Sequence, residues 1–347
     1  MKRVVYFIMK RVTRISVGAF FSRIEIVGTE NIPRDRAIIF APNHQNAFLD
    51  AFMVGCISPV GIHYLTRADV FNNPFRWFMD ALQMMPIYRI RDGFGQLSQN
   101  AGVFEACRKL FSQRKSVLIF PEGNHGENYY LRPLTKGISR LACESQEAME
   151  NDELWIQPVG LNYFDLRKPR RKAMVVFGKP LRVKDYMDEY NHQKAKALKD
   201  LRDQVSAEML KVMIIPENDE NYAFKVSALT KKNESLRFDE LRELLATVNS
   251  AESQRRPIRF FTAIAKFLGI ANLPPLLVIS HVLKTKIKDV VFTSSIKWAI
   301  GLFLFPIWWL LLFLVSLFLF GAKMAWIVLG VAIVLLFLRQ EFMKLAN

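Results

Sequence analysis

Residues 37–50 read AIIFAPNHQNAFLD, within a chain of 347 residues. The apolar run 37–41 predicts a buried β-strand, and Phe48 begins a stretch with helical character. His44 therefore lies between a strand and a helix N-terminus, which disfavours the imidazolium and leaves a neutral ring able to accept a proton. Asp50 can orient that ring only if the backbone turns between them, because six positions of unbroken helix span about 9 Å. Taken alone, the pair is better interpreted as a surface histidine and an unrelated aspartate at the start of a helix.

A second apolar run enters a polar turn at residues 117–125, which read VLIFPEGNH. Gly123 would let the backbone approach a ligand closely, and Glu122 would present a carboxylate beside it. A third segment, residues 85–92, reads MPIYRIRD and places Arg89 on or just after a strand, where its planar guanidinium could bind a phosphate. An ordinary surface ion pair is the alternative for that arginine. The recurrence of polar turns after strands weakens the case for an unrelated surface histidine.

Short β-like runs alternate with helical stretches between the two ends of the chain, which is typical of an α/β domain. Several runs are continuously apolar, which predicts a mixed sheet covered by helices on both faces. The expected strands are residues 24–27, 37–41, 61–66, 86–90, 116–120, 154–159 and 173–177. The expected helices are residues 48–56, 97–113, 137–149 and 190–213. A fourth segment, residues 157–162, reads QPVGLN; we expect it to close a strand and interpret it as structural.

In this order and at these spacings, the four segments resemble the glycerophospholipid acyltransferase family over residues 24–180. The resemblance implies that His44 is the catalytic base and that Asp50 is its orienting partner. It also implies three substrate-binding residues: Arg89, Glu122 and Gly123. The implied reaction transfers a fatty acyl group from acyl-CoA or acyl-carrier protein to a hydroxyl group, with no metal and no other cofactor.

The acceptor implied by the resemblance is a lysophospholipid, in first place 1-acyl-sn-glycerol 3-phosphate, in phospholipid biosynthesis. Glycerol 3-phosphate and a phosphate-free lyso-aminolipid are alternatives, and a catalytically inactive membrane-tethered binding protein is the alternative from another class. Two departures from the family pattern bear on this choice. Five residues separate His44 from Asp50 where the commoner pattern has four, and Asn124-His125-Gly126 replace the usual Thr-Arg-Ser. Loss of that arginine argues against phosphate binding there unless His125 replaces it.

Residues 298–338 contain a single ionisable side chain, Lys323. At ~1.5 Å of rise per residue this stretch makes roughly 60 Å of helix, about two crossings of a ~30 Å hydrocarbon layer. We therefore expect a transmembrane helical hairpin that turns near Gly321, with a single span and a re-entrant piece as the alternative. Basic residues flank both arms, so the positive-inside rule predicts an integral membrane protein whose catalytic domain lies on the cytoplasmic face.

The first twenty residues contain basic but no acidic side chains. On a helical wheel, an apolar stripe lies opposite a basic face that includes Lys10 and Arg14. The stripe consists of Val5, Ile8, Val12, Ile15 and Ala19. This pattern predicts an amphipathic helix at the membrane surface, and a helix that covers the protein's own core is the alternative.

The expected division of the chain has four parts. They are a membrane-surface helix at 1–20, an α/β acyltransferase domain at 21–215, a charged helical connecting region at 216–297 and the transmembrane hairpin at 298–338.

The composition fits a membrane-bound protein with anionic partners. Forty-eight Lys and Arg against 32 Asp and Glu give a formal net charge of +16, which suits membrane lipid, a phosphate-bearing acceptor and an acyl thioester donor. Nucleic-acid binding is disfavoured because no aromatic-basic module accompanies the charge, and a serine hydrolase because no Gly-x-Ser-x-Gly segment occurs. The three cysteines, Cys56, Cys107 and Cys143, are widely spaced and odd in number, which argues against a disulfide framework and for a reducing compartment.

Overall fold

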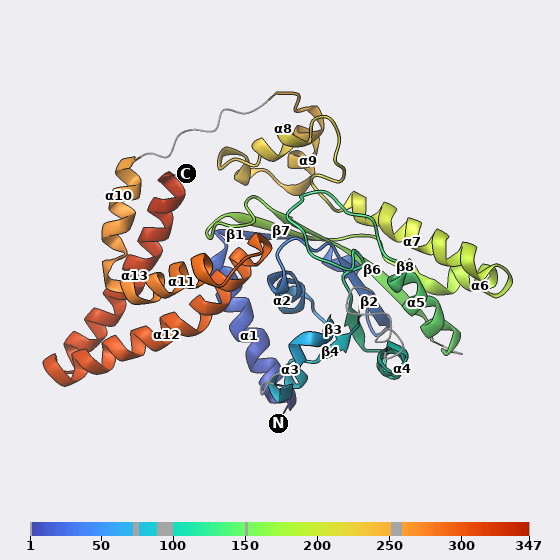
Figure 1. Cartoon of the computed structure of the whole chain (residues 1–347), viewed down its shortest axis with the longest axis horizontal. Coiled ribbons are helices and arrows are strands. Elements are labelled where there is room, and N and C mark those ends of the chain that lie inside the picture. Colours follow the sequence, from blue (N-terminus) through green and yellow to red (C-terminus); the bar gives the residue numbers. More distant parts are fainter. Residues whose placement is uncertain (1, 72–75, 89–99, 150–151, 251–258, 347) are drawn as a thin grey trace.

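The computed structural model describes residues 2–71, 76–88, 100–149, 152–250 and 259–346. Its centre is a mixed sheet with the strand order β1-β7-β6-β2-β5-β3-β4, and β8 pairs with β6 (Figure 1). The strands are β1 Arg23–Val27, β2 Ala37–Pro42, β3 Ile62–Arg67, β4 Met84–Ile87, β5 Ser116–Leu118, β6 Leu154–Tyr163, β7 Lys172–Phe177 and β8 Leu181–Arg182. Among these strands, β6 runs antiparallel to β7 and β8, and the other pairs are parallel. The predicted mixed sheet is confirmed.

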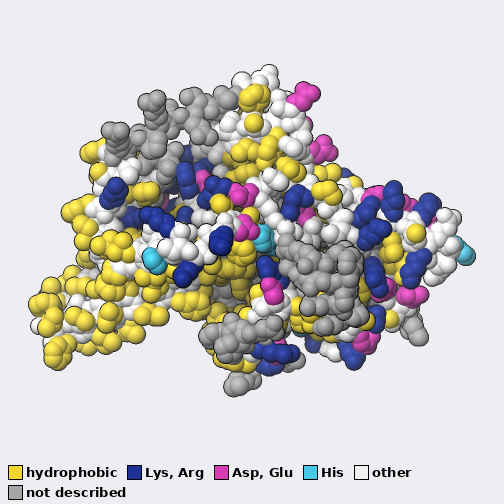
Figure 2. Space-filling model, in the orientation of Figure 1, with side chains coloured by type: hydrophobic (Ala, Val, Ile, Leu, Met, Phe, Trp, Pro, Cys, Tyr) yellow, Lys and Arg dark blue, Asp and Glu magenta, His cyan; other side chains and the backbone are white. Residues whose placement is uncertain are grey.

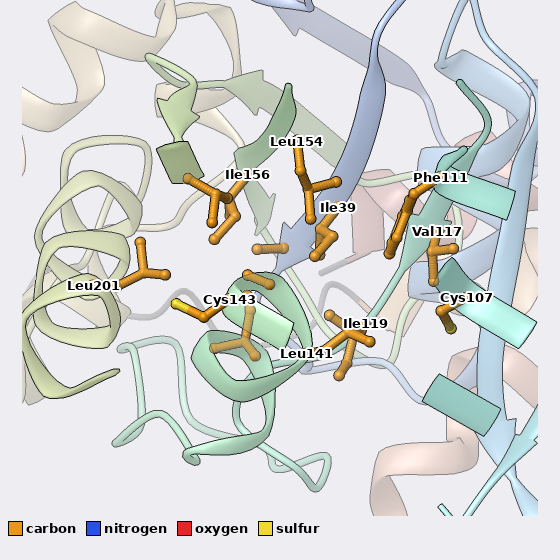
Figure 3. Packing of buried hydrophobic residues seen from close by; sticks show 14 of the residues in the cluster. Ile39, Cys107, Phe111, Val117, Ile119, Leu141, Cys143, Leu154, Ile156 and Leu201 are labelled. Atoms are coloured by element: carbon orange, nitrogen blue, oxygen red, sulfur yellow. The ribbon is translucent and has the colours of Figure 1, made fainter. Parts of the chain in front are cut away.

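Helices cover both faces of this sheet. The helices of the α/β part are α1 Lys2–Phe20, α2 Phe48–Ile57, α3 Arg76–Ala81, α4 Asn100–Phe111, α5 Gly137–Glu147, α6 Met187–His192 and α7 Lys194–Lys211. Figure 3 shows one apolar layer, in which Ile39 and Val117 of the sheet meet Cys107, Leu141 and Leu201 of α4, α5 and α7. The opposite layer joins the sheet to α1 and α2, so continuously apolar strands are buried on both sides.

Several elements differ from the prediction. The expected helix 190–213 is split into α6 and α7 at Gln193, whose backbone leaves the helical region at φ −139° and ψ 66°. The QPVGLN segment lies within β6, which extends past the expected end at residue 159 to Tyr163, where it pairs antiparallel with β7. The short helix α3 was not expected. The expected strand 86–90 corresponds to β4, and its last two positions lie outside the described residues.

Helix α1 buries one face in the protein and exposes another. Val17 is fully buried, whereas Phe7 and Ile15 are exposed. Lys10, expected on the outer basic face, instead donates from Nζ to the carbonyl oxygen of Ser58 at 2.8 Å. Ser58 follows the C-terminus of α2, where unpaired carbonyl groups attract a cation. Contact of the exposed apolar strip with lipid stays a prediction.

The stretch expected as a charged connecting region contains two kinds of structure. Helices α8 Tyr222–Ser227 and α9 Phe238–Thr247 pack toward β7, where Phe238, Leu241 and Leu245 join a cluster with Met174 and Val176. Helices α10 Arg259–Leu268 and α11 Leu273–Thr285 are apolar and bent by 51° relative to each other. The first pair therefore extends the globular core, and the second accompanies the C-terminal helices.

The C-terminal part is a helical hairpin. Helices α12 Thr293–Phe320 and α13 Ala322–Ala346 are joined at Gly321, whose φ of 82° lies in the left-handed region that glycine tolerates. The stretches Val290–Phe320 and Ala322–Leu345 are each long and apolar enough to cross a membrane, and the bent pair α10–α11 could form one more span. The hairpin projects from the α/β part, and Figure 2 shows hydrophobic side chains covering its free end. The predicted pair of apolar helices is confirmed.

Candidate active site

His44 and Asp50 meet at the carboxyl end of β2. The His44 Nδ1 atom lies 2.9 Å from an Asp50 carboxylate oxygen, Oδ2. Helix α2 begins only at Phe48, so the aspartate is on its first turn and the preceding residues form a tight turn. Ala47 adopts φ 45° and ψ −134° there, a conformation that L-residues rarely take. This turn, rather than a helix, brings the two side chains together across the five intervening residues.

The Asp50 carboxylate is fully buried and surrounded by donors. Its Oδ2 accepts hydrogen bonds from the backbone N–H groups of Gln45 at 2.9 Å and Asn46 at 2.7 Å. Its Oδ1 accepts from the Tyr163 hydroxyl at 2.6 Å. A site in which every neighbour donates suits an ionised carboxylate, which only accepts hydrogen bonds. It therefore places the proton of the His44 ring on Nδ1 and leaves Nε2 as a proton acceptor.

The His44 ring is held between aromatic groups and remains partly accessible. It stacks on Phe120 with ring centroids 3.6 Å apart and an interplanar angle of 10°, and it meets the His125 ring edge-on at 5.7 Å. The side chain is 14% exposed, so a substrate can reach it. Its orientation is therefore fixed on one edge by Asp50 and on one face by Phe120.

Glu122 contacts the turn that carries His44 through the backbone. Its Oε1 accepts from the His44 N–H at 2.6 Å, and its Oε2 pairs with the Arg132 Nε at 2.6 Å. The carboxylate is 1% exposed, and burial raises its pKa to about 7 although Arg132 and the hydrogen bonds act in the opposite direction. Arg132 also donates to the carbonyl oxygens of His44, at 3.2 Å, and Asn124. This ion pair ties the turn after β5 to the turn after β2.

Gly123 and Asn43 shape these turns. Gly123 has a φ of 70°, and a side chain there would place its Cβ 2.8 Å from Thr135 Cγ2. The group that approaches Gly123 closely is therefore the Thr135 side chain, where the sequence had suggested a ligand. The buried Asn43 side chain donates to the Leu161 carbonyl at 2.9 Å and accepts from its N–H at 2.7 Å. These two hydrogen bonds attach the residue that follows β2 to the backbone of β6.

The beginning of α12 also contacts the site. The fully buried Ser295 hydroxyl donates to the Asn46 carbonyl at 2.5 Å and accepts from the Leu49 N–H at 3.0 Å. One helical turn earlier, Phe292 packs edge-on against His125 with ring centroids 4.9 Å apart. The helix that leads into the apolar hairpin therefore caps α2 at the turn that carries the His–Asp pair.

The structure brings together four of the five residues singled out from the sequence: His44, Asp50, Glu122 and Gly123. The reason is that β2 has β5 and β6 as parallel neighbours, so their carboxyl ends meet at one edge of the sheet. Arg89 lies outside the described residues.

Sequence reasoning missed Arg132, Tyr163 and Ser295. Tyr163 ends β6, so placing that strand beside β2 would have drawn attention to it. The other two follow no strand and belong to no motif, so they carry no local signal.

Part of the chain is similar to known proteins. Residues 23–162 match the family model described as Acyltransferase. A glycerol-3-phosphate O-acyltransferase of Saccharomyces cerevisiae is 31% identical over 115 residues, which cover 32% of this chain and 15% of the yeast protein. A 1-acyl-sn-glycerol-3-phosphate acyltransferase of Chlamydomonas reinhardtii is 27% identical over 127 residues, 36% of each chain. The matches thus span well under half of these relatives.

A solved structure is also similar. The 1-acyl-sn-glycerophosphate acyltransferase of Thermotoga maritima aligns with a TM-score of 0.43 and 17% identity, over 60% of this chain and 79% of that one.

Proposed function

We propose that this chain, whose residues 23–162 match the acyltransferase family model, transfers a fatty acyl group from an acyl thioester to a hydroxyl group of a lysophospholipid, in first place 1-acyl-sn-glycerol 3-phosphate. The observation that carries the proposal is the 2.9 Å contact between His44 Nδ1 and the buried Asp50 carboxylate. It prepares Nε2 to accept a proton from an incoming hydroxyl. The Chlamydomonas relative, named for this acceptor, supports the choice.

In the proposed reaction, His44 Nε2 takes the proton of the acceptor hydroxyl while the oxygen attacks the thioester carbonyl carbon. The tetrahedral intermediate collapses, the C–S bond breaks, and the imidazolium returns its proton to the departing sulfur. The products are an ester and a free thiol, so the histidine ends as it began. Asp50 stabilises the transient imidazolium and holds its ring in one tautomer.

Glu122 and Arg132 are positioning residues in this mechanism. The Glu122 carboxylate contacts the His44 N–H and the Arg132 guanidinium, so its contribution passes through the shape of the turn. Phosphate binding by Arg89 stays a prediction, since that residue lies outside the described part of the chain. His125 is a further candidate for contact with the acceptor, because its ring adjoins the His44 ring.

Two other acceptors deserve comparison. Glycerol 3-phosphate is favoured by the 31% identity to the yeast glycerol-3-phosphate O-acyltransferase. A phosphate-free lyso-aminolipid is favoured by Asn124-His125-Gly126, which lack the arginine usual at this position. Arg132 does not simply replace it, because its guanidinium is paired with Glu122.

The membrane arrangement is part of the proposal. Helices α12 and α13 anchor the chain, and Lys297 near the start of one and Lys344 near the end of the other suit the cytoplasmic side. The His44 turn contacts the beginning of α12, so it lies at this face.

The test is an acyl-transfer assay with purified full-length protein. Acyl-CoA and acyl-carrier protein are compared as donors, and 1-acyl-sn-glycerol 3-phosphate, glycerol 3-phosphate and a phosphate-free lyso-aminolipid as acceptors. Transfer should be fastest to the lysophospholipid, and His44→Ala should lower it at least about 100-fold, the lower range for loss of a general base. His192→Ala, at the end of α6, is the matched control. Full activity in His44→Ala, or none in the wild type with any pair, contradicts the proposal.

A further inference from the structure

A large cavity lies where the C-terminal helices meet the α/β part. Its volume is about 1650 Å³, and it is bounded by α1, α11, α12, α13 and the segment between β6 and β7. Typical small-molecule pockets are ~300–1000 Å³, so this cavity suits a larger ligand. His44 and Asp50 are not among the described residues that line it.

One end of the cavity is cationic. Its described lining contains seven Lys or Arg side chains and one acidic side chain, Asp165. Six of the cations are Lys168, Arg171, Lys231, Lys232, Lys297 and Lys344. Glu234 pairs with Arg171 and lies 3.6 Å from Lys344, which offsets part of this charge and leaves an excess of cations. On the face seen in Figure 2, Lys and Arg side chains gather where the hydrophobic helices join the rest of the chain. This end suits a phosphate group.

The remaining walls are apolar. They include Leu276 and Ile279 of α11 and Leu302, Phe305 and Trp309 of α12. Along α12, the distance from Lys297 to Trp309 is about 18 Å at ~1.5 Å per residue. One leaflet of a ~30 Å hydrocarbon layer has a similar depth. The cavity therefore combines a cationic end at the membrane surface with apolar walls as long as a lipid tail.

Trp298 separates this cavity from the candidate active site. Its indole lines the cavity, donates to the Ser16 hydroxyl at 3.1 Å, and packs on Phe52 with ring centroids 5.3 Å apart. Phe52 belongs to α2, the helix that carries Asp50. The cavity is therefore a neighbour of the catalytic turn rather than a part of it.

We propose that this cavity binds one anionic glycerophospholipid with two acyl chains. Its phosphate lies among the cationic side chains near Lys231, Lys297 and Lys344, and its chains lie along α11 and α12. The size of the cavity favours two chains over one, and the charge favours an anionic headgroup over a zwitterionic one. The inference concerns binding and does not depend on the proposed acyl transfer.

The test measures lipid retained by the full-length protein in detergent, by native mass spectrometry. Dioleoyl phosphatidylglycerol is the anionic probe, dioleoyl phosphatidylcholine the zwitterionic one and oleyl phosphate, which has no acceptor hydroxyl, the one-chain phosphate lipid. We expect one phosphatidylglycerol per chain, retained at least about tenfold better than either other lipid. Equal retention of phosphatidylcholine, or tighter binding of oleyl phosphate, would overturn the proposal.

Two pairs of variants locate the site. Gly301 lines the cavity, and a Cβ there meets the Phe305 ring at an ordinary 3.5 Å, so Gly301→Phe should fill the space and abolish retention. Gly330→Phe on α13 is the control, because a Cβ at Gly330 has nothing within 4 Å and the residue does not line the cavity. Equal retention by both variants contradicts the assignment.

The second pair changes charge without changing packing. Lys231→Gln with Lys232→Gln should weaken phosphatidylglycerol retention roughly tenfold, since each basic residue near a membrane surface contributes measurably to anionic lipid binding. Lys196→Gln with Lys199→Gln, on α7, removes the same charge away from the cavity and should have no effect. The same loss in both double variants would show that net charge, not this site, attracts the lipid.

Discussion

The Ser295 hydroxyl donates a hydrogen bond to the carbonyl oxygen of Asn46 at 2.5 Å. It also accepts from the Leu49 N–H, in the first turn of α2, which in addition donates to the Asn46 carbonyl at 3.2 Å; the N-cap residue of this helix, Ala47, provides no side-chain cap. The helix that leads into the apolar hairpin thus supplies the cap of the helix that carries Asp50. Because of this contact, the position of α12 and the geometry of the His–Asp pair depend on each other.

Ser295→Ala should lower kcat about tenfold and cost about 1–2 kcal/mol of stability, because it leaves a buried donor and acceptor without this partner. Ser294→Ala is the matched control: Ser294 is equally buried on the same helix, but it donates to the Leu166 carbonyl and not to the turn between His44 and Asp50. Thermal unfolding and steady-state kinetics in detergent give the two readouts. Equal losses of kcat in both variants would mean that Ser295 acts through general stability alone.

Tyr163→Phe should lower kcat roughly tenfold with a smaller effect on KM, because the Asp50 Oδ1 loses its hydroxyl donor and holds the imidazolium less well. The control is Tyr190→Phe, which changes a similarly buried tyrosine on α6. Acyl-transfer rates as a function of pH are the measurement. Wild-type kinetics at every pH in Tyr163→Phe would contradict a role for this hydrogen bond.

Glu122 should make stability depend on pH near neutrality. Burial raises its pKa from 4.5 to about 7 in the folded protein, so between these values the folded chain binds a proton that the unfolded chain does not. The contribution of this group is therefore present at low pH and lost as the pH rises through 7. We expect the Tm of the wild type minus that of Glu122→Gln to fall between pH 5 and pH 7 and to level off above that range. A constant difference, or a rise, contradicts the shifted pKa.

Ala47→Gly should leave the free energy of unfolding within about 0.5 kcal/mol of the wild-type value. Relief of the positive φ offsets the loss of the methyl group and the greater entropy of the unfolded chain. Ala51→Gly, within α2, should cost about 1 kcal/mol, since glycine is disfavoured in a helix interior. The comparison is made by thermal unfolding of the two variants. Equal destabilisation would show that the turn between His44 and Asp50 carries no backbone strain.

Much of the fold could be predicted because its signals are local. Each of the seven expected strands overlaps a strand of the structure, since a buried strand is a short apolar run whatever it pairs with. The hairpin was equally clear, because residues 298–338 contain one charged side chain. Errors arose where tertiary contacts override local pattern, as for Lys10, which is drawn to the C-terminus of α2.

The sequence by itself determined the elements of this protein and the polar turns that follow its strands, because periodicity, turn residues and motif spacing act over a few positions. Only the tertiary structure decided which side chains complete the site. Arg132 reaches the His44 carbonyl across 88 positions, Tyr163 reaches Asp50 across 113, and Ser295 reaches Asn46 across 249. Such contacts depend on the order of strands in the sheet and on where α12 rests against α2. That order is set by the burial of many apolar side chains at once, and no single segment records it.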